Sequence, residues 1–138
     1  MRSQRLPLLA KKAVRVAQED LFIIQAHVAS KVFGAHGTVP HLDPVKITDM
    51  EKTIDRLEHQ IKPARKFVVP GETEAAAWLD VARTVARRVE RSVLAAHAKL
   101  SLDEQVLAYM NRLSSLLFAL ARLAAKKSGR REAHPVYR

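Results

Sequence analysis

The sequence contains no cysteine, and this absence removes several classes of site. Disulfide frameworks, thiol nucleophiles and cysteine-ligated zinc or iron–sulfur centres all require that residue. A chain without thiols suits a reducing compartment, so we expect a cytoplasmic location. No apolar run approaches the roughly 20 residues of a membrane span, and the N-terminus lacks the apolar core of a signal peptide. We therefore expect no membrane association.

Aromatic residues are also scarce, at 5% of the chain. Proteins that bind single-stranded nucleic acid stack bases on aromatic rings, so this scarcity argues against such a partner. Neither Gly-x-Gly-x-x-Gly nor a P-loop pattern is present. The histidines show neither His-Glu-x-x-His nor paired i, i+4 spacing, so no metal site built from protein clusters is expected. The histidines are His27, His36, His41, His59, His97 and His134.

Length and composition favour one globular domain over residues 1–138, with basic tails at about 1–8 and 128–138. Hydrophobic residues make up 48% of the chain and the net charge is +10. Residues 1–15 contain basic residues and no acid, and residues 122–138 contain a single acid, Glu132. Such ends attract polyanions, namely phosphate ligands, nucleic acid or acidic membranes. The alternative is a solubilising surface with frayed ends.

Helical periodicity runs through the whole sequence, and no stretch alternates polar and apolar residues for long. We expect a first helix over residues 7–33, ended by Gly34 and Gly37. Three more are expected over residues 48–62, 73–99 and 101–127. Long helices joined by short links predict an all-α fold, an antiparallel four-helix bundle.

Three segments resemble helix N-termini. Thr48 and Glu51 form a capping-box pattern, in which each side chain accepts from an N–H at the helix end. Ser101 and Glu104 form a second such box. Thr73 is the expected N-cap of the third helix.

The third helix carries an unusual density of arginine. At about 100° per residue, Arg83, Arg87, Glu90 and Arg91 lie within about one third of its circumference. Arginines at i, i+4 and i+8 repel one another, which favours an anion bound over them. The alternative is a solvated face in which Glu90 pairs with its neighbours. The apolar residues expected on the opposite side are Trp78, Val85, Val89 and Val93.

The fourth helix has a polar stripe beside its apolar one. Asn111, Ser114, Ser115, Phe118 and Arg122 follow one another at helical spacing. These residues suit a partly closed site that hydrogen-bonds and packs against a ligand. A polar layer that fixes the register of the bundle is the alternative.

The stretches Phe67–Arg91 (FVVPGETEAAAWLDVARTVARRVER) and Tyr109–Arg122 (YMNRLSSLLFALAR) resemble the signature of PduO-type ATP:cob(I)alamin adenosyltransferases. A weaker similarity at Glu19–Ile24 extends the resemblance over roughly residues 10–125. The resemblance implies a homotrimeric helix bundle with sites between subunits. Such an enzyme transfers the 5′-deoxyadenosyl group of ATP to the cobalt of cob(I)alamin and makes adenosylcobalamin. A cobalamin-dependent acceptor enzyme is a further implied partner.

The same resemblance implies roles for individual residues. The catalytic set is Arg83, Arg87 and Glu90, and Mg²⁺ arrives with ATP, with Glu90 as its one candidate protein ligand. Phe67 is expected at the lower face of the corrin, where it keeps the cobalt without a lower ligand. The implied ATP-binding residues are Arg83, Arg87, Arg88, Glu90, Arg91 and Asn111. The implied cobalamin-binding residues are Phe67, Ser114 and Phe118.

Three positions depart from the family pattern. Residues 1–20 contain no Thr-Gly-Asp-like segment, so we expect the family's phosphate loop and first helix to be missing. Asp80 stands where His is usual, and Ser115 replaces an acid. Three explanations of the missing loop compete. Basic residues near the N-terminus replace it, or the segment is supplied elsewhere, or the bundle has lost the reaction. The alternative functions are thus a non-catalytic corrinoid- or nucleotide-binding bundle and a basic nucleic-acid-binding bundle.

Overall fold

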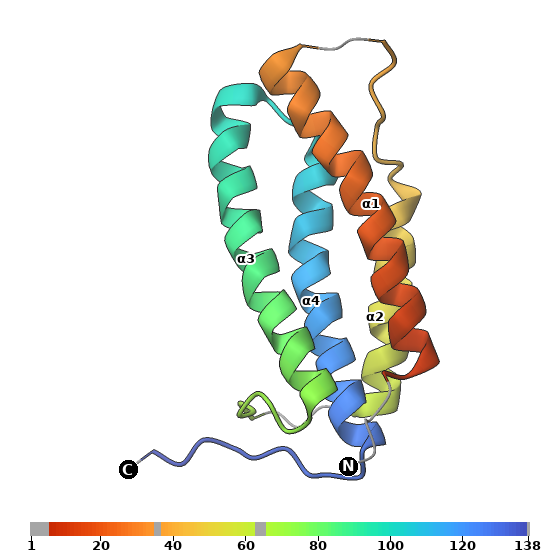
Figure 1. Ribbon diagram of the computed structural model, residues 1–138, viewed down its shortest axis with the longest axis vertical. Coiled ribbons are helices and arrows are strands. Elements are labelled where there is room, and N and C mark those ends of the chain that lie inside the picture. The colour runs from red at the N-terminus through yellow and green to blue at the C-terminus, as the bar shows by residue number, and fades with distance from the viewer. Residues whose placement is uncertain (1–5, 35–36, 63–65, 138) are drawn as a thin grey trace.

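A computed structural model describes the chain in three stretches. The helices run alternately up and down, and the start of the first helix and the end of the last one lie at the lower end of the bundle (Figure 1). The described residues form helices and no strand, which confirms the expected all-α four-helix bundle. The described stretches are residues 6–34, 37–62 and 66–137. The helices are α1 (Leu8–Phe33), α2 (Val45–Ile61), α3 (Glu74–Leu100) and α4 (Glu104–Lys127).

Helix α4 is the core of the bundle. It packs most extensively against α3, less against α2 and least against α1. Val106, Tyr109 and Leu120 on α4 are completely buried. By length and composition α4 would be apolar enough to cross a membrane, yet 67% of its most apolar stretch is buried inside the bundle. Its apolar character is therefore explained by the helices around it.

One of the predicted helix starts is confirmed. Thr73 is the N-cap of α3, and its hydroxyl accepts a hydrogen bond from the Ala76 N–H at 3.1 Å. The prediction for α2 was wrong, because the helix begins at Val45, before Thr48. There the Asp43 carboxylate accepts from the Val45 N–H at 2.9 Å, so an Asp-Pro turn opens the helix.

The predicted start of the fourth helix was also wrong. Ser101 has a φ of 50° and closes α3, with its N–H donating to the His97 carbonyl at 3.0 Å. Helix α4 begins at Glu104, and Asp103 is its N-cap residue. A serine that ends one helix cannot also cap the next, because its left-handed backbone differs from the extended conformation of an N-cap.

The apolar side of α3 does not face the core as a whole. Trp78 is 67% exposed, Val85 and Val89 are also exposed, and only Val93 of the expected set is buried. The helix is rotated so that part of the arginine side approaches α4. This rotation leaves an apolar stripe uncovered by any described residue. The residues through which α3 packs include Ala76, Leu79, Ala86 and Val93.

A buried polar network ties three helices together. Asp20 on α1 accepts a hydrogen bond from the Tyr109 hydroxyl at 2.9 Å and pairs with Lys46 of α2 at 2.9 Å. Burial, and then the hydrogen bond to Asp20, raise the pKa of Tyr109, so its hydroxyl stays protonated. The hydrogen bond between Lys46 and Asp20 raises the pKa of Lys46. The network fixes α1, which has few other contacts with α4.

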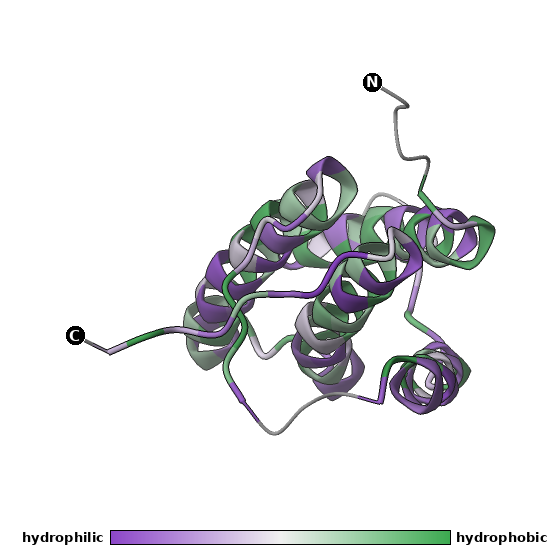
Figure 2. Ribbon diagram, turned by 90° about the horizontal axis from the view of Figure 1, so that it is seen from below, coloured by the Kyte–Doolittle hydropathy of each residue, from purple (hydrophilic) through white to green (hydrophobic). Residues whose placement is uncertain are grey.

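The C-terminal segment lies against the connector before α3 instead of extending as a free tail. The Val69 N–H donates to the Ala133 carbonyl at 2.8 Å, and His134 Nδ1 lies 2.8 Å from the Phe67 carbonyl. This segment crosses the lower end of the bundle (Figure 2). The expectation of one domain with basic tails stays a prediction, and residues 1–5 of the first tail lie outside the described part of the chain.

Candidate functional site

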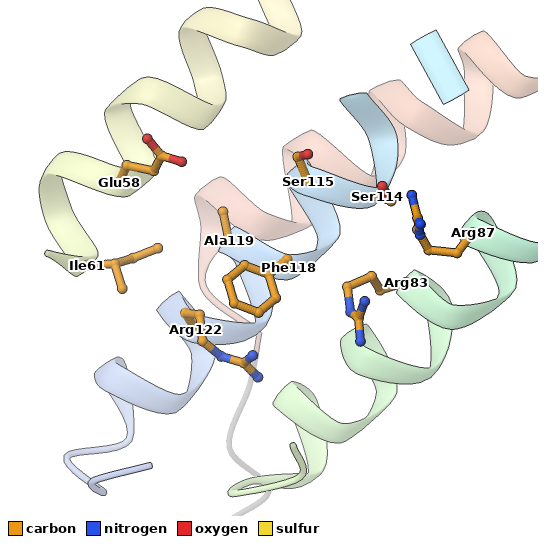
Figure 3. A pocket seen from close by; sticks show the side chains of 9 residues that line it. All are labelled: Glu58, Ile61, Arg83, Arg87, Ser114, Ser115, Phe118, Ala119 and Arg122. Carbon is orange, nitrogen blue, oxygen red and sulfur yellow. The ribbon is translucent and has the colours of Figure 1, made fainter. Parts of the chain in front are cut away.

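A cavity of about 430 Å³ lies where α2, α3 and α4 meet, and we call it the arginine cavity. Arg83 and Arg87 extend into it from α3, facing Ser114 and Phe118 on α4 (Figure 3). The two arginines lie one helical turn apart, so their guanidinium groups line the same wall. The lining residues are Glu58, Ile61, Arg83, Arg87, Ser114, Ser115, Phe118, Ala119 and Arg122.

Arg83 is the cation of this cavity that has no internal partner. Among the described residues no carboxylate lies within ion-pair distance of it, whereas Arg87 and Arg122 each have one. Its Nε is buried without a hydrogen-bond partner in the described chain. Its Cζ lies 6.0 Å from the centre of the Phe118 ring, at the outer limit of a cation–π contact. An anion in the cavity would supply the missing partner.

Arg87 is held by a chain of hydrogen bonds between α3 and α4. Its Nη1 donates to Glu90 at 3.0 Å, and the other oxygen of Glu90 accepts from the Asn111 amide at 2.8 Å. Glu90 is buried, so it positions these two side chains and has little access to solvent. The alternative of a solvated arginine face predicted that Glu90 pairs with its neighbours, and Glu90 does pair with Arg87.

Arg122 forms the floor of the cavity. It is 4% exposed and pairs with Asp80 at 2.8 Å and with Glu132 at 2.6 Å. Its guanidinium carbon lies 4.8 Å from the centre of the Phe118 ring, which places that ring between two arginines. Burial raises the pKa of Glu132, and the charge of Arg122 opposes that rise. Asp80, which the sequence marked only as a departure from the family pattern, is thus half of a buried ion pair.

A second cavity of about 600 Å³ lies between α4 and the C-terminal segment, and we call it the basic cavity. It shares Ile61, Phe118 and Arg122 with the arginine cavity. Phe118 therefore forms a wall common to both. The remaining lining residues are Lys62, Lys66, Val68, Lys126, Gly129, Arg130, Arg131, Glu132 and His134.

The structure gathers only part of the predicted site around the arginine cavity. Arg83, Arg87, Ser114 and Phe118 line it. Glu90 and Asn111 do not line the cavity; Glu90 accepts hydrogen bonds from both Arg87 and Asn111. The other three predicted residues are exposed and line neither cavity; they are Phe67, which is 80% exposed, Arg88 and Arg91.

Sequence patterns missed some lining residues. Glu58 and Ile61 come from α2, which carries none of the motifs, and no spacing on that helix sets them apart from its other residues. Arg130 and Arg131 belong to what was interpreted as a tail. Their part in the basic cavity depends on how the C-terminal segment docks.

The arginine and asparagine motifs that meet at this site lie within the part of the chain that matches known proteins. The sequence profile described as "Cobalamin adenosyltransferase" matches residues 4–124. The chain belongs to this family. A corrinoid adenosyltransferase of Citrobacter freundii is 36% identical over 113 residues, which cover 82% of this chain and 64% of that protein. The corrinoid adenosyltransferase of Bacillus subtilis is 39% identical over 83 residues, or 60% of this chain and 43% of that protein.

The fold agrees with a solved member of the family. A variant of the PduO-type ATP:corrinoid adenosyltransferase from Lactobacillus reuteri, in complex with cobalamin and ATP, superposes with a TM-score of 0.84 at 25% identity. That similarity covers 100% of this chain and 74% of the Lactobacillus chain. This family member spans less than two thirds of the length of the curated relatives named above.

Proposed function

We propose that this adenosyltransferase-family chain transfers the 5′-deoxyadenosyl group of ATP to the cobalt of cob(I)alamin. The observation that carries the proposal is Arg83, a guanidinium without an internal partner that lines a cavity beside Ser114 and Phe118. Family membership supports the same activity. ATP, with Mg²⁺, and the corrinoid are both substrates in this scheme.

The reaction requires the protein only to bind the two substrates and to stabilise the charge that develops on the leaving group. Cob(I)alamin is itself the nucleophile, and its cobalt attacks the 5′ carbon of the ribose. The Co–C bond forms as the C–O bond to triphosphate breaks, and triphosphate leaves with the bonding electrons. Arg83 and Arg87 would hold the triphosphate and stabilise its developing charge from a rigid helix.

The two cavities suggest where the substrates meet. The triphosphate would lie in the arginine cavity, where Arg83 lacks an internal partner. The corrinoid would approach from the side of the basic cavity. Phe118, the wall common to both, would then contact the corrin edge. Phe67 is well exposed, as a ring that covers the lower face of a corrin must be before the corrinoid binds.

The metal that accompanies ATP would be held mainly by the phosphates. Both carboxylate oxygens of Glu90 are already engaged, by Arg87 and by Asn111. Glu90 therefore fits a positioning role better than that of a Mg²⁺ ligand. Glu58, an exposed carboxylate that lines the arginine cavity, is more accessible to a hydrated cation.

We also propose that the active form is a cytoplasmic homotrimer with sites between subunits, as the sequence resemblance implies. The exposed apolar stripe of α3, which contains Trp78, Val81, Val85 and Val89, supports an assembly because monomers rarely leave such a surface uncovered. Arg88 and Arg91 are exposed on the same helix and would serve either an adjacent subunit or its ATP. An acceptor enzyme that uses adenosylcobalamin would take the product.

The decisive experiment follows the absorbance change of cob(I)alamin with ATP and Mg²⁺ and measures ATP binding by calorimetry. Arg83→Met removes a charged donor that has no internal partner, so the fold should survive. We expect ATP affinity to fall by about 10- to 100-fold, the equivalent of about 1.5–3 kcal/mol for a charge-assisted hydrogen bond. Turnover should fall by about 100-fold or more.

Arg56→Met on α2 is the matched control, since Arg56 is exposed and lines neither cavity. It should retain wild-type affinity and turnover. ATP binding without any turnover would contradict the enzymatic proposal and identify a non-catalytic nucleotide-binding bundle. Equal loss in both variants would mean that overall charge, and not the arginine cavity, attracts the nucleotide.

A further inference from the structure

Two histidines and an aspartate lie together at the end of the bundle where α1 ends and α4 begins. His27 lies near the end of α1, His41 in the connector to α2, and Asp103 at the start of α4. One potential ligand atom from each of the three lies within 4.8 Å of the others. Asp103 precedes Phe118 by about 22 Å along α4, at 1.5 Å per residue, so the cluster is separate from the arginine cavity. The figure shows these chain segments together at the upper end of the bundle (Figure 1).

The carboxylate of Asp103 stands between the two imidazoles. His41 Nδ1 lies 2.9 Å from one of its oxygens, and His27 Nε2 lies 3.6 Å from the other. Ligands at about 2.05 Å from a tetrahedral Zn²⁺ are about 3.3 Å apart, which lies between these two separations. His41 is exposed and His27 is 1% exposed. The cluster thus combines a rigid imidazole with an adjustable one.

The Asp103 side chain faces these histidines and does not cap α4. As the N-cap residue of α4 its side chain would normally accept from an N–H of the first turn, yet it makes no such bond. Its two carboxylate oxygens instead face the two imidazoles, one toward His41 and the other toward His27.

His27 turns an unprotonated nitrogen toward the cluster. Its Nε2 accepts a hydrogen bond from the Asp103 N–H at 3.2 Å, which requires an unprotonated nitrogen, the form that binds metals. The other ring nitrogen, Nδ1, is buried without a partner in the described chain. A fully buried imidazole with one long hydrogen bond is a costly packing residue. A metal bond at Nε2 would replace this long hydrogen bond with a stronger interaction.

We propose that His27, His41 and Asp103 form a binding site for one divalent transition-metal ion of the Zn²⁺ class. Two imidazoles and a carboxylate suit Zn²⁺ or Co²⁺, and three protein ligands leave the fourth position to water. The ligands come from α1, the connector and α4, so the ion would tie α1 to the core helix. The site does not depend on the adenosyltransferase activity and uses none of its residues.

The test is calorimetric titration of the metal-free full chain with Zn²⁺, without ATP or corrinoid. We expect one ion per chain. His41→Ala and Asp103→Asn should each weaken binding by at least about 10-fold, because loss of a direct ligand costs no less than loss of its supporting hydrogen bond. Co²⁺ should show the visible absorption bands of a four-coordinate ion in the wild type and lose them in His41→Ala.

His59→Ala is the matched control, since His59 is an exposed histidine on α2 outside the cluster. It should bind Zn²⁺ with wild-type affinity. Far-UV circular dichroism establishes that each variant is folded, and Zn²⁺ should raise the Tm of the wild type but not of His41→Ala. The proposal is overturned if the wild type takes up no metal, or if His41→Ala and Asp103→Asn bind it as the wild type does.

Discussion

The buried pair between Arg122 and Asp80 allows a quantitative test of the structure. Both side chains are nearly inaccessible to water, and Glu132 is the second carboxylate on Arg122. Arg122→Met leaves two carboxylates without their cation. Removing one partner of a buried pair costs about 3–5 kcal/mol because the remaining charge stays desolvated. At about 2.1 cal/mol/K per residue, the unfolding entropy of this chain converts that cost into a Tm lower by about 10–17 °C.

The companion variants separate charge from packing. Asp80→Asn keeps the shape of the side chain and leaves Arg122 paired with Glu132, so its cost should be smaller than that of Arg122→Met. The double variant removes the cation together with one of its carboxylates. It should therefore be more stable than Arg122→Met alone, with a coupling free energy of about 1–3 kcal/mol.

The assay is thermal and urea unfolding followed by far-UV circular dichroism, at one protein concentration because subunit association would change the apparent stability. Arg56→Met, a change at an exposed arginine of α2, is the control and should stay within about 0.5 kcal/mol of wild type. Strictly additive costs in the double variant, or an Arg122→Met cost no larger than the control, would refute a buried ion pair.

Two further predictions concern the C-terminal segment and the exposed face of α3. Burial raises the pKa of Glu132, so docking of the segment takes up a proton and weakens as pH rises from the ordinary carboxyl pKa through the raised value. Exchange of the Val69 amide, corrected for its intrinsic rate, should be slower at about pH 5 than at pH 7, and Glu132→Gln should abolish the difference. Trp78→Glu should reduce the mass in sedimentation equilibrium from three times the chain mass of 15.5 kDa to that of one chain; a wild type already at one chain would contradict the trimer.

Much of the fold follows from local signals in the sequence. Helical periodicity predicted each of the helices, and Thr73 predicted the start of α3, because a cap hydrogen bond involves neighbours three residues apart. The same reasoning from neighbouring residues predicted the wrong helix starts at Thr48 and Ser101. Several residues there offer a plausible cap, and the paths of the connectors select among them.

The candidate site, too, was predicted from the sequence only in part. The arginine and asparagine motifs identified the family and the wall formed by Arg83 and Arg87. They gave no sign of Glu58, nor of the basic cavity beneath the C-terminal segment. Those residues lie on elements without a motif, and only the packing of the helices brings them to the cavity.

By itself, the sequence determined the helices, the family and the arginine wall, because each depends on spacing within a single segment. The tertiary structure decided which side of α3 is buried, since the rotation of a helix is set by the helices it packs against. It also paired Asp80 with Arg122, 42 residues apart, and brought His27 to Asp103, 76 residues apart. Charges that are far apart in the sequence become partners only when packing brings them together.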